Sequence, residues 1–167
     1  MLKTKIFFKK KCSLELLSNF VNKNFDSTFF VPDSIFLKLL KKIKKKIICS
    51  RENHAVSMAF GSSLLGKKNL IIMQNSGLGL SIDSLIGTFD LYREGCLIFL
   101  SNRGNLPWEE IQHKKWGSIT KKTINAIKFR FIEFNKYGIG AVNKGYDLAF
   151  SKKKIVFIIF ERGNIDE

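Results

Sequence analysis

The residues best suited to chemistry are a carboxylate, Glu52, and a small-residue turn, 73–79, that lies further along the chain. The turn reads Met-Gln-Asn-Ser-Gly-Leu-Gly and continues from the apolar segment 70–73. Its two glycines let the backbone approach a ligand closely, because glycine tolerates backbone angles that other residues avoid. Glu52 stands where an expected strand, 47–49, gives way to a helical pattern. A carboxylate at the carboxyl end of one strand, beside a glycine turn from the next, predicts a cofactor site in an α/β sheet.

The elements that must position these residues alternate between strands and helices. Strands are expected over short apolar segments, namely 28–31, 47–49, 70–73, 96–100, 128–132 and 155–160. Helices are expected where apolar residues recur at helical spacing, namely over 14–21, 34–46, 52–65, 80–91, 119–126 and 137–150. The repeated β-then-α units predict an α/β fold with a doubly wound, mostly parallel sheet of about six strands flanked by helices.

Four further expectations concern individual elements. Ser13 is expected to cap the first helix, because a serine hydroxyl can accept a bond from an unpaired backbone N–H of the first turn. The continuous apolar run 96–100 predicts a strand buried on both faces, and the strand 47–49 is expected to be at least half-buried. The segment 101–116 is expected to form a loop.

Size and composition indicate a single folded domain over residues 1–167. The chain is 45% hydrophobic with 16 Phe, which is ample for a core, and no apolar run approaches the roughly 18–20 residues of a membrane span. The start, 1–8, is basic and lacks a long apolar region and a cleavage site, so we expect a cytoplasmic protein. The cysteines are odd in number and far apart, which predicts reduced, mostly buried thiols and no metal site.

The net charge of +15 raises the question of an acidic partner. A basic chain of this kind can bind nucleic acid. Lysine dominates the surplus, however, whereas arginine is preferred for bidentate contacts to bases and phosphates. The lysine clusters also lie near expected helix ends and loops and do not form one stripe. An acidic partner subunit therefore accounts for the charge better than nucleic acid does.

Four segments carry a resemblance to a known family. They are 31–34 (Val-Pro-Asp-Ser), 51–55 (Arg-Glu-Asn-His-Ala), 73–79, and Arg103-Gly104 with the later Gln112-His113 and 117–120. In this order they resemble the pyrimidine-binding domain of thiamine-diphosphate enzymes, in the family of phosphonopyruvate decarboxylase and sulfopyruvate decarboxylase. The last expected strand, with Glu161-Arg162-Gly163 after it, resembles the last strand of that domain. The similarity covers nearly the whole chain, and 73–79 is its most specific segment.

The sequence departs from the family pattern at three places. Phe30 stands where the family usually has a glycine, and Leu80 follows the Gly-Leu-Gly turn where an asparagine is usual. After Arg103-Gly104 the family tends to have a glutamate within a residue or two, whereas this chain reaches Glu109 only later. These departures fall around the expected substrate end, so they leave the identity of the oxo acid open.

The resemblance implies roles for the residues of the cofactor end. Glu52 would hydrogen-bond a nitrogen of the cofactor's pyrimidine ring, and Gln74, Asn75, Ser76 and Gly77 would line that ring, partly through backbone. His54 would be a catalytic proton carrier, although a buried or interface histidine explains it equally well. The structural alternative is a helix-capping Glu52 and a strand-to-helix turn with no ligand.

A second set of residues is implied for the substrate. Asp33 and Ser34 come from the end of the first strand of the sheet, and Arg103 and His113 follow the fourth. Arg103 suits a phosphonate or sulfonate group. Asp33 could instead be a helix cap behind Pro32, and Arg103 a surface residue that fixes its own loop.

The family holds the cofactor's diphosphate through Mg²⁺ in a second domain that begins with Gly-Asp-Gly, a motif this chain lacks. We therefore expect that domain, and the Mg²⁺, on a partner β subunit in an α₂β₂ or larger assembly. The chain would be the α subunit of a 2-oxo acid decarboxylase. Phosphonopyruvate is the first candidate for the small anionic substrate, with sulfopyruvate or a related carboligase reaction as alternatives. The non-enzyme alternative is a basic scaffold or a nucleic-acid-binding protein.

Overall fold

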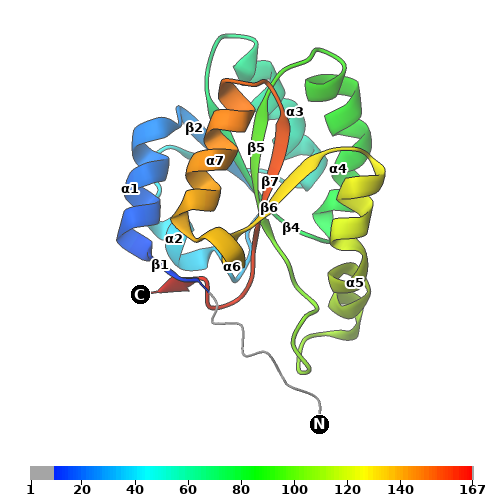
Figure 1. The fold of residues 1–167 in the computed structure, drawn as a ribbon. Helices are drawn as coiled ribbons and strands as arrows, with labels where there is room; N and C mark the ends of the chain where they lie inside the picture. Colours follow the sequence, from blue (N-terminus) through cyan, green and yellow to red (C-terminus); the bar gives the residue numbers. More distant parts are fainter. Residues whose placement is uncertain (1–9, 167) are drawn as a thin grey trace.

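Six parallel strands form the central sheet, in the order β3-β2-β4-β5-β7-β6, in a computed structural model that describes residues 10–166 (Figure 1). The strands are β2 (Ser27–Phe30), β3 (Lys46–Ile48), β4 (Asn69–Gln74), β5 (Cys96–Ser101), β6 (Arg130–Glu133) and β7 (Ile155–Phe160). Two short strands, β1 (Cys12–Ser13) and β8 (Ile165–Asp166), pair with each other apart from this sheet. The predicted α/β fold is confirmed. The segment 1–8, on which the expectation of a cytoplasmic start rested, lies outside the described residues.

Helices cover both faces of the sheet. They are α1 (Leu14–Asn24), α2 (Leu37–Lys42), α3 (Glu52–Ser63), α4 (Gly77–Leu85), the π-helical turn η1 (Ile86–Asp90), α5 (Ile111–Ala126), α6 (Phe134–Tyr137) and α7 (Ile139–Phe150). One core joins α1, α2, α6 and α7 to one face, and a second core joins α3, α4, η1 and α5 to the other (Figure 1). The strand β4 contributes side chains to both cores. Leu70 and Ile72 belong to the first core, and Ile71 and Met73 belong to the second, because successive side chains of a strand point to opposite faces of the sheet.

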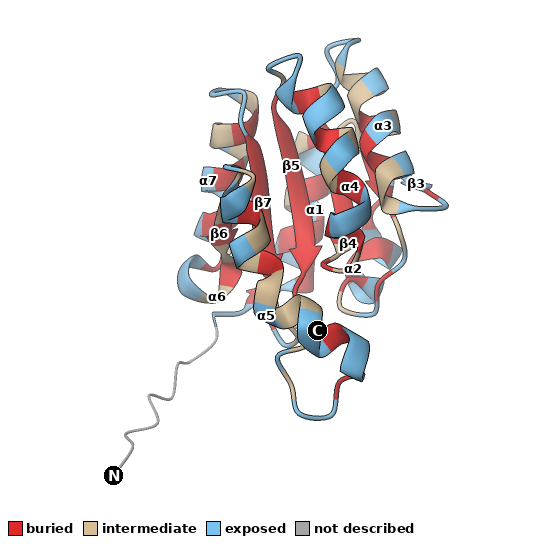
Figure 2. Ribbon diagram, turned by 90° about the vertical axis from the view of Figure 1, so that its right-hand side faces the viewer, coloured by how far each residue is buried: buried red, intermediate tan, exposed pale blue. Residues whose placement is uncertain are grey.

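The central strands are apolar and buried along their whole length. All six residues of β5 and of β7 are buried, and so are the first five residues of β4 (Figure 2). Such runs are typical of parallel strands that are covered on both faces. Ser13 also caps α1 as expected, since its side chain accepts a hydrogen bond from the N–H of Leu16 at 3.1 Å.

The expected helix over 34–46 is much shorter in the structure, where α2 spans Leu37–Lys42. The side chain of Asn22, from α1, explains where it ends. Its amide donates to the carbonyl of Lys42 at 3.0 Å, and its oxygen accepts from the N–H of Lys44 at 2.8 Å. These bonds satisfy backbone groups that a continuing helix would have paired internally, so the chain turns towards β3.

The expectation that 47–49 is a buried or half-buried strand is wrong for most of it. The strand β3 lies at the edge of the sheet and pairs only with β2. All three of its residues are exposed, Ile48 to 66%, and only Cys49 beyond it is buried. An edge strand has a neighbour on one side, and here no helix covers its outer residues.

Three helix boundaries also differ from expectation. The helix expected from 80 begins at Gly77, so the glycine turn forms the first turn of α4. The helix expected from 119 begins at Ile111, which shortens the expected loop 101–116. The helix expected over 137–150 is broken at Gly138, whose φ of 57° separates α6 from α7.

The cysteines agree with the expectation from sequence. Cys12, Cys49 and Cys96 are free and buried, and burial raises the pKa of each thiol. Among residues 10–166, no helix is long and apolar enough to cross a membrane. The same residues contain no group of His, Cys, Asp and Glu that could hold a metal ion.

Candidate functional site

The expected site residues meet at the carboxyl edge of the sheet. Because all six strands are parallel, the segments that follow them leave from one edge. Asp33 follows β2, Glu52 follows β3, Asn75 follows β4 and Arg103 follows β5. The chain runs from β2 outward to β3 and then returns to β4 on the other side of β2. At such a reversal of strand order the carboxyl ends of the two strands, here β2 and β4, are the usual place of a ligand crevice in α/β sheets.

The carboxyl group of Glu52 lies directly against Gly77. A Cβ atom at position 77 would stand 2.2 Å from Cγ of Glu52, 2.3 Å from its Cδ and 2.5 Å from its Oε1. Gly77 therefore leaves the room in which the end of the Glu52 side chain lies, beside the first turn of α4. Glu52 is half-buried, and within residues 10–166 its carboxylate makes no hydrogen bond or ion pair. The carboxylate is thus available to a donor from a ligand.

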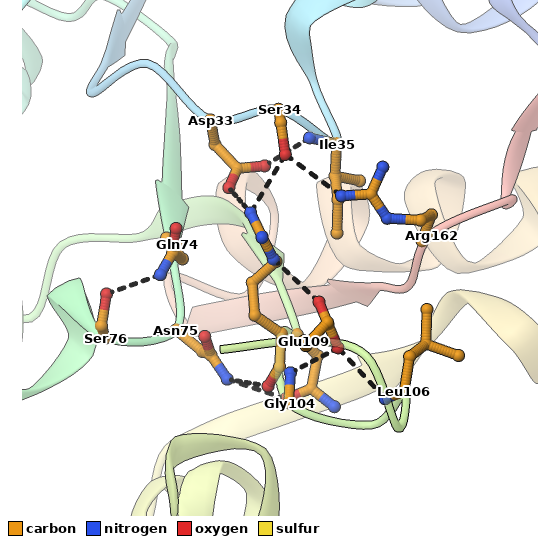
Figure 3. Close-up of polar contacts among 12 residues, drawn as sticks. Asp33, Ser34, Ile35, Gln74, Asn75, Ser76, Gly104, Leu106, Glu109 and Arg162 are labelled. Atoms are coloured by element: carbon orange, nitrogen blue, oxygen red, sulfur yellow. Dashed lines mark hydrogen bonds and ion pairs between the residues drawn. The ribbon is translucent and has the colours of Figure 1, made fainter. Parts of the chain in front are cut away.

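The turn after β4 is ordered by its own polar groups. Nε2 of Gln74 donates to Oγ of Ser76 at 2.9 Å (Figure 3), and the N–H of Asn75 donates to the carbonyl of Ser101 at 2.9 Å. Gln74 and Ser76 are half-buried. Both residues come just before Gly77, against which the side chain of Glu52 lies.

Asn75 faces the protein interior and is fully buried. Its Nδ2 lies within hydrogen-bonding distance of the carbonyl of Arg103 at 2.9 Å, Oγ1 of Thr120 at 3.1 Å and Oδ1 of Asn102 at 3.2 Å. The side chain therefore ties the turn to the loop after β5 and to α5. In this structure Asn75 positions the turn, and its backbone is the part that remains at the crevice.

Arg103 lies at the centre of a second group of polar residues at the carboxyl edge of the sheet. Its Nε donates to Oε1 of Glu109 at 2.9 Å and its Nη1 donates to Oγ of Ser34 at 3.0 Å (Figure 3). Nη1 also lies 3.6 Å from Oδ2 of Asp33, whose side chain is 1% exposed. Oδ1 of Asp33 accepts the N–H of Ile35 at 2.8 Å. Asp33 thus closes the turn after β2 and faces Arg103. It does not cap α2, whose N-cap is Phe36, and its role towards a substrate stays a prediction.

Glu109, which follows Arg103-Gly104 at a longer spacing than the family pattern, returns its carboxylate to both residues. Its Oε2 accepts the N–H groups of Gly104 at 2.8 Å and Leu106 at 3.1 Å, while Oε1 accepts Arg103 (Figure 3). Burial by itself raises the pKa of Glu109, but the two backbone bonds and Arg103 outweigh it, so the pKa lies below its usual value. The loop brings the Glu109 carboxylate back to Arg103 and Gly104, although Glu109 lies several residues further along the sequence.

Arg162 is a member of this group that sequence reasoning did not select. It follows β7, and its Nη2 donates to Oγ of Ser34 at 3.3 Å (Figure 3). Its guanidinium group lies over the ring of Trp108 at 5.2 Å. Two guanidinium groups therefore reach one hydroxyl at the edge of the sheet. The sequence contained a signal for Arg162, because this residue comes soon after β7, the neighbour of β5 in the sheet.

The two histidines are less closely tied to these groups. His54 is exposed, and its Nδ1 lies 3.1 Å from Oγ of Ser50. His113 is buried in α5, and its carbonyl oxygen lies against Gly104, where a Cβ would approach it to 1.9 Å. Within the described chain no hydrogen bond joins either imidazole to Glu52 or to Arg103. The structure therefore defines the surroundings of Glu52 and Arg103, whereas the roles expected for His54 and His113 stay predictions.

Comparison with known proteins agrees with this geometry. The fold matches that of a benzoylformate decarboxylase from Polynucleobacter necessarius, with a TM-score of 0.68 and 17% identity over 92% of this chain and 29% of that one. In sequence, the chain is 35% identical over 99 residues to the sulfopyruvate decarboxylase subunit alpha of Methanocaldococcus jannaschii. It is 32% identical over 82 residues to the subunit of the same name from Methanococcus maripaludis. No model of a known protein family matches the chain.

These similarities confirm the resemblance that the motifs indicated. The fold is that of the matching part of the benzoylformate decarboxylase, a six-stranded parallel sheet flanked by helices. In sequence the chain is homologous to sulfopyruvate decarboxylase alpha subunits. The alignments span 59% and 49% of the length of the first two relatives, so the chain matches about half of each.

Proposed function

We propose that this chain is the pyrimidine-binding subunit of a thiamine-diphosphate-dependent 2-oxo acid decarboxylase. The observation that carries the proposal is the placement of Glu52. Its carboxylate is half-buried, lies against Gly77 at the reversal of strand order, and has no partner among the described residues. A carboxylate so placed can hold a proton at a ring nitrogen of a bound heterocycle, and partial burial strengthens that bond.

The residues present fit the pyrimidine end of thiamine diphosphate. Glu52 would face the ring nitrogen, and the backbone of the turn with Gln74 and Ser76 would lie along the ring. Gly77 keeps the room that the Glu52 side chain occupies. When bound, the cofactor supplies the nucleophilic carbon for cleavage next to a 2-oxo group. This chain's own part is to orient the ring and to hold the proton at its nitrogen.

The substrate class follows from the second group of residues. Arg103 and Arg162 both reach Oγ of Ser34, and paired guanidinium groups suit a tetrahedral anionic head group. The relatives by sequence are alpha subunits of sulfopyruvate decarboxylase. We therefore place sulfopyruvate first and phosphonopyruvate second, which reverses the order drawn from the motifs alone. His113 and Asp33 would support this end of the site.

The diphosphate and Mg²⁺ are proposed to be bound by a second chain. The relatives carry the word alpha in their names, which fits a partner beta subunit. The surplus of positive charge on this chain would favour association with an acidic partner. We propose an α₂β₂ or larger assembly, with the active site where the two kinds of chain meet.

The test begins with co-expression of the full chain and a chain that carries the Gly-Asp-Gly motif. Thiamine diphosphate binding is measured by calorimetry with Mg²⁺ present, and release of carbon dioxide is measured with sulfopyruvate and with phosphonopyruvate. The proposal expects binding by the complex and turnover of at least one oxo acid. A complex that neither binds the cofactor nor releases carbon dioxide would contradict it and would favour the scaffold or nucleic-acid alternative.

A further inference from the structure

A basic hollow lies at the amino edge of the sheet, at the end opposite to Glu52. It has a volume of about 640 Å³ and is lined by residues at the starts of β5, β6 and β7. Six cations line it: Arg93, Lys128, Arg130, Lys152, Lys153 and Lys154. The acids among the lining residues are Asp90 and Glu94. The volume falls within the range of small-molecule sites, roughly 300–1,000 Å³.

The backbone at this hollow has an unusual feature. Within residues 10–166, the non-glycine residues with positive φ are Arg93 at 55°, Lys128 at 60° and Lys153 at 50°. All three line the hollow, and all three are cations. Left-handed backbone is disfavoured for residues with a side chain, and such residues concentrate at functional sites.

Two of these residues occupy a position where glycine is the usual choice. At the end of α5, the N–H of Phe129 donates to the carbonyl of Ile124, and the N–H of Lys128 donates to that of Asn125. This pair of bonds is the Schellman ending of a helix, and Lys128 holds its left-handed position. Arg93 holds the same position after η1, because the N–H of Glu94 reaches the carbonyl of Phe89 and its own N–H reaches that of Asp90.

The attraction between a cation and the carboxyl end of a helix does not by itself explain why positions 93 and 128 carry cations. A cation at a helix carboxyl end is favoured by about two- to fivefold through the helix dipole. Left-handed backbone disfavours a non-glycine residue by about five- to thirtyfold in population. Glycine would therefore suit positions 93 and 128 at least as well for folding, and a use for the charge is needed to explain the cations.

The charge in the hollow is largely uncompensated. Lys153 pairs with Glu94 at 3.0 Å. In the part of the chain that the structure describes, the side chains of Arg93, Lys128 and Arg130 make no hydrogen bond or ion pair. Arg93, Lys128 and Arg130 are exposed, so their side chains can contact a bound anion without breaking another bond.

We propose that this hollow binds a small anion with linked phosphate groups, of about the size of a nucleoside diphosphate. Arg93, Lys128 and Arg130 would contact the phosphates, and the half-buried ring of Phe129 would form an apolar part of the wall. The site is distinct from the crevice that holds Glu52 and does not depend on the proposed decarboxylase function.

The test compares the full chain with the double variant Arg93→Gly/Lys128→Gly. Binding of inorganic tripolyphosphate and of ADP is measured by calorimetry at about physiological ionic strength, where diffuse attraction is screened. Wild type is expected to bind at least one of them with one-to-one stoichiometry. The double variant is expected to bind about tenfold or more weakly, because each lost cation removes a charge-assisted hydrogen bond. Its melting temperature should equal or exceed that of wild type, since glycine relieves the left-handed strain.

The matched control is Lys41→Gln/Lys144→Gln, which removes the same charge from exposed positions on α2 and α7. It is expected to bind within about twofold of wild type. Preference for ADP over tripolyphosphate would identify a nucleotide, and the reverse an inorganic phosphate chain. Equal weakening in both double variants would show only diffuse attraction and overturn the proposal. Absence of binding by wild type, or binding of nucleic acid alone, would overturn it as well.

Discussion

The carboxyl group of Glu52 occupies the space that a side chain at position 77 would need, with Oε1 only 2.5 Å from where a Cβ would stand. Glu52 begins α3, which follows β3, whereas Gly77 begins α4, which follows β4. The two helices pack side by side on the same face of the sheet. The glycine in the turn therefore has a specific task, which is to let one helix bring its acid to the start of the next.

Replacement of Gly77 by alanine should damage the proposed site more than stability. The new methyl group overlaps three atoms at the flexible end of the half-buried Glu52 side chain, which can move aside, so the free energy of unfolding should fall by less than about 1 kcal/mol. The displaced carboxylate should also weaken thiamine diphosphate binding in the assembled complex. Urea denaturation and calorimetry measure the two effects.

Gly61→Ala is the matched control for that variant. Gly61 lies inside α3, and a Cβ there would meet no atom within 4 Å. The control should stabilise the chain by about 0.5–1 kcal/mol, because alanine favours a helix over glycine. If Gly77→Ala behaved like Gly61→Ala in both assays, the close contact with Glu52 would not be important.

Loss of the Asn75 amide should loosen the loop after β5. Asn75→Ala removes the donor that reaches Arg103, Thr120 and Asn102, and unpaired buried groups cost about 1–3 kcal/mol. Asn143→Ala, at an exposed position of α7, should change the free energy of unfolding by less than about 0.5 kcal/mol. Chemical denaturation of both variants checks the difference, and equal values would argue against a structural role for the Asn75 side chain.

Glu109 should contribute an acid-sensitive part of the stability. Its pKa is lower in the folded chain than the ordinary 4.5, so its contribution is complete above that pH and is lost as the pH falls through the lower folded value. Glu109→Gln should lower the free energy of unfolding by about 2–3 kcal/mol at pH 7. The difference from wild type should shrink below about pH 4. A difference that is the same at pH 7 and pH 3 would contradict the assignment.

Arg162 should matter for the substrate and less for the cofactor. Arg162→Lys keeps the charge but loses the second guanidinium contact at Ser34, so KM for the preferred oxo acid should rise about tenfold. Thiamine diphosphate affinity should stay within about twofold. Arg130→Lys, at the other edge of the sheet, serves as the control. Steady-state kinetics of the complex measure KM for both variants. If Arg162→Lys and Arg130→Lys both had the KM of wild type, that result would count against the role of Arg162.

Much of the fold could be predicted because the central strands coincide with short runs of apolar residues in the sequence. The apolar run in β5 predicts burial on both faces, and the parallel sheet then brings Glu52 and Asn75 to one edge. Local sequence did not predict the length of α2, because the residue that ends it is Asn22 from another helix. Nor did it predict the exposure of β3, which depends on its position at the edge of the sheet.

The site was predicted in part for the same reason. Residues that directly follow strands were selected correctly for their location, as with Asp33 and Arg103. Arg162 reaches Ser34 across 128 positions, and only the order of the strands shows that they are near. Glu109 returns to Gly104 through a loop whose path depends on its hydrogen bonds. Contacts between distant segments of this kind have no signature in local spacing.

The measurement that tests the central claim most directly is the turnover of the assembled complex with Glu52→Gln. The variant keeps the size of the side chain that Gly77 accommodates and removes the charge that would hold the proton at the ring nitrogen. At saturating thiamine diphosphate and oxo acid, the account predicts a rate about 10²–10⁴-fold below that of wild type, with the complex intact. A near-normal rate under those conditions would contradict the assignment of Glu52 and with it the proposed function of the chain.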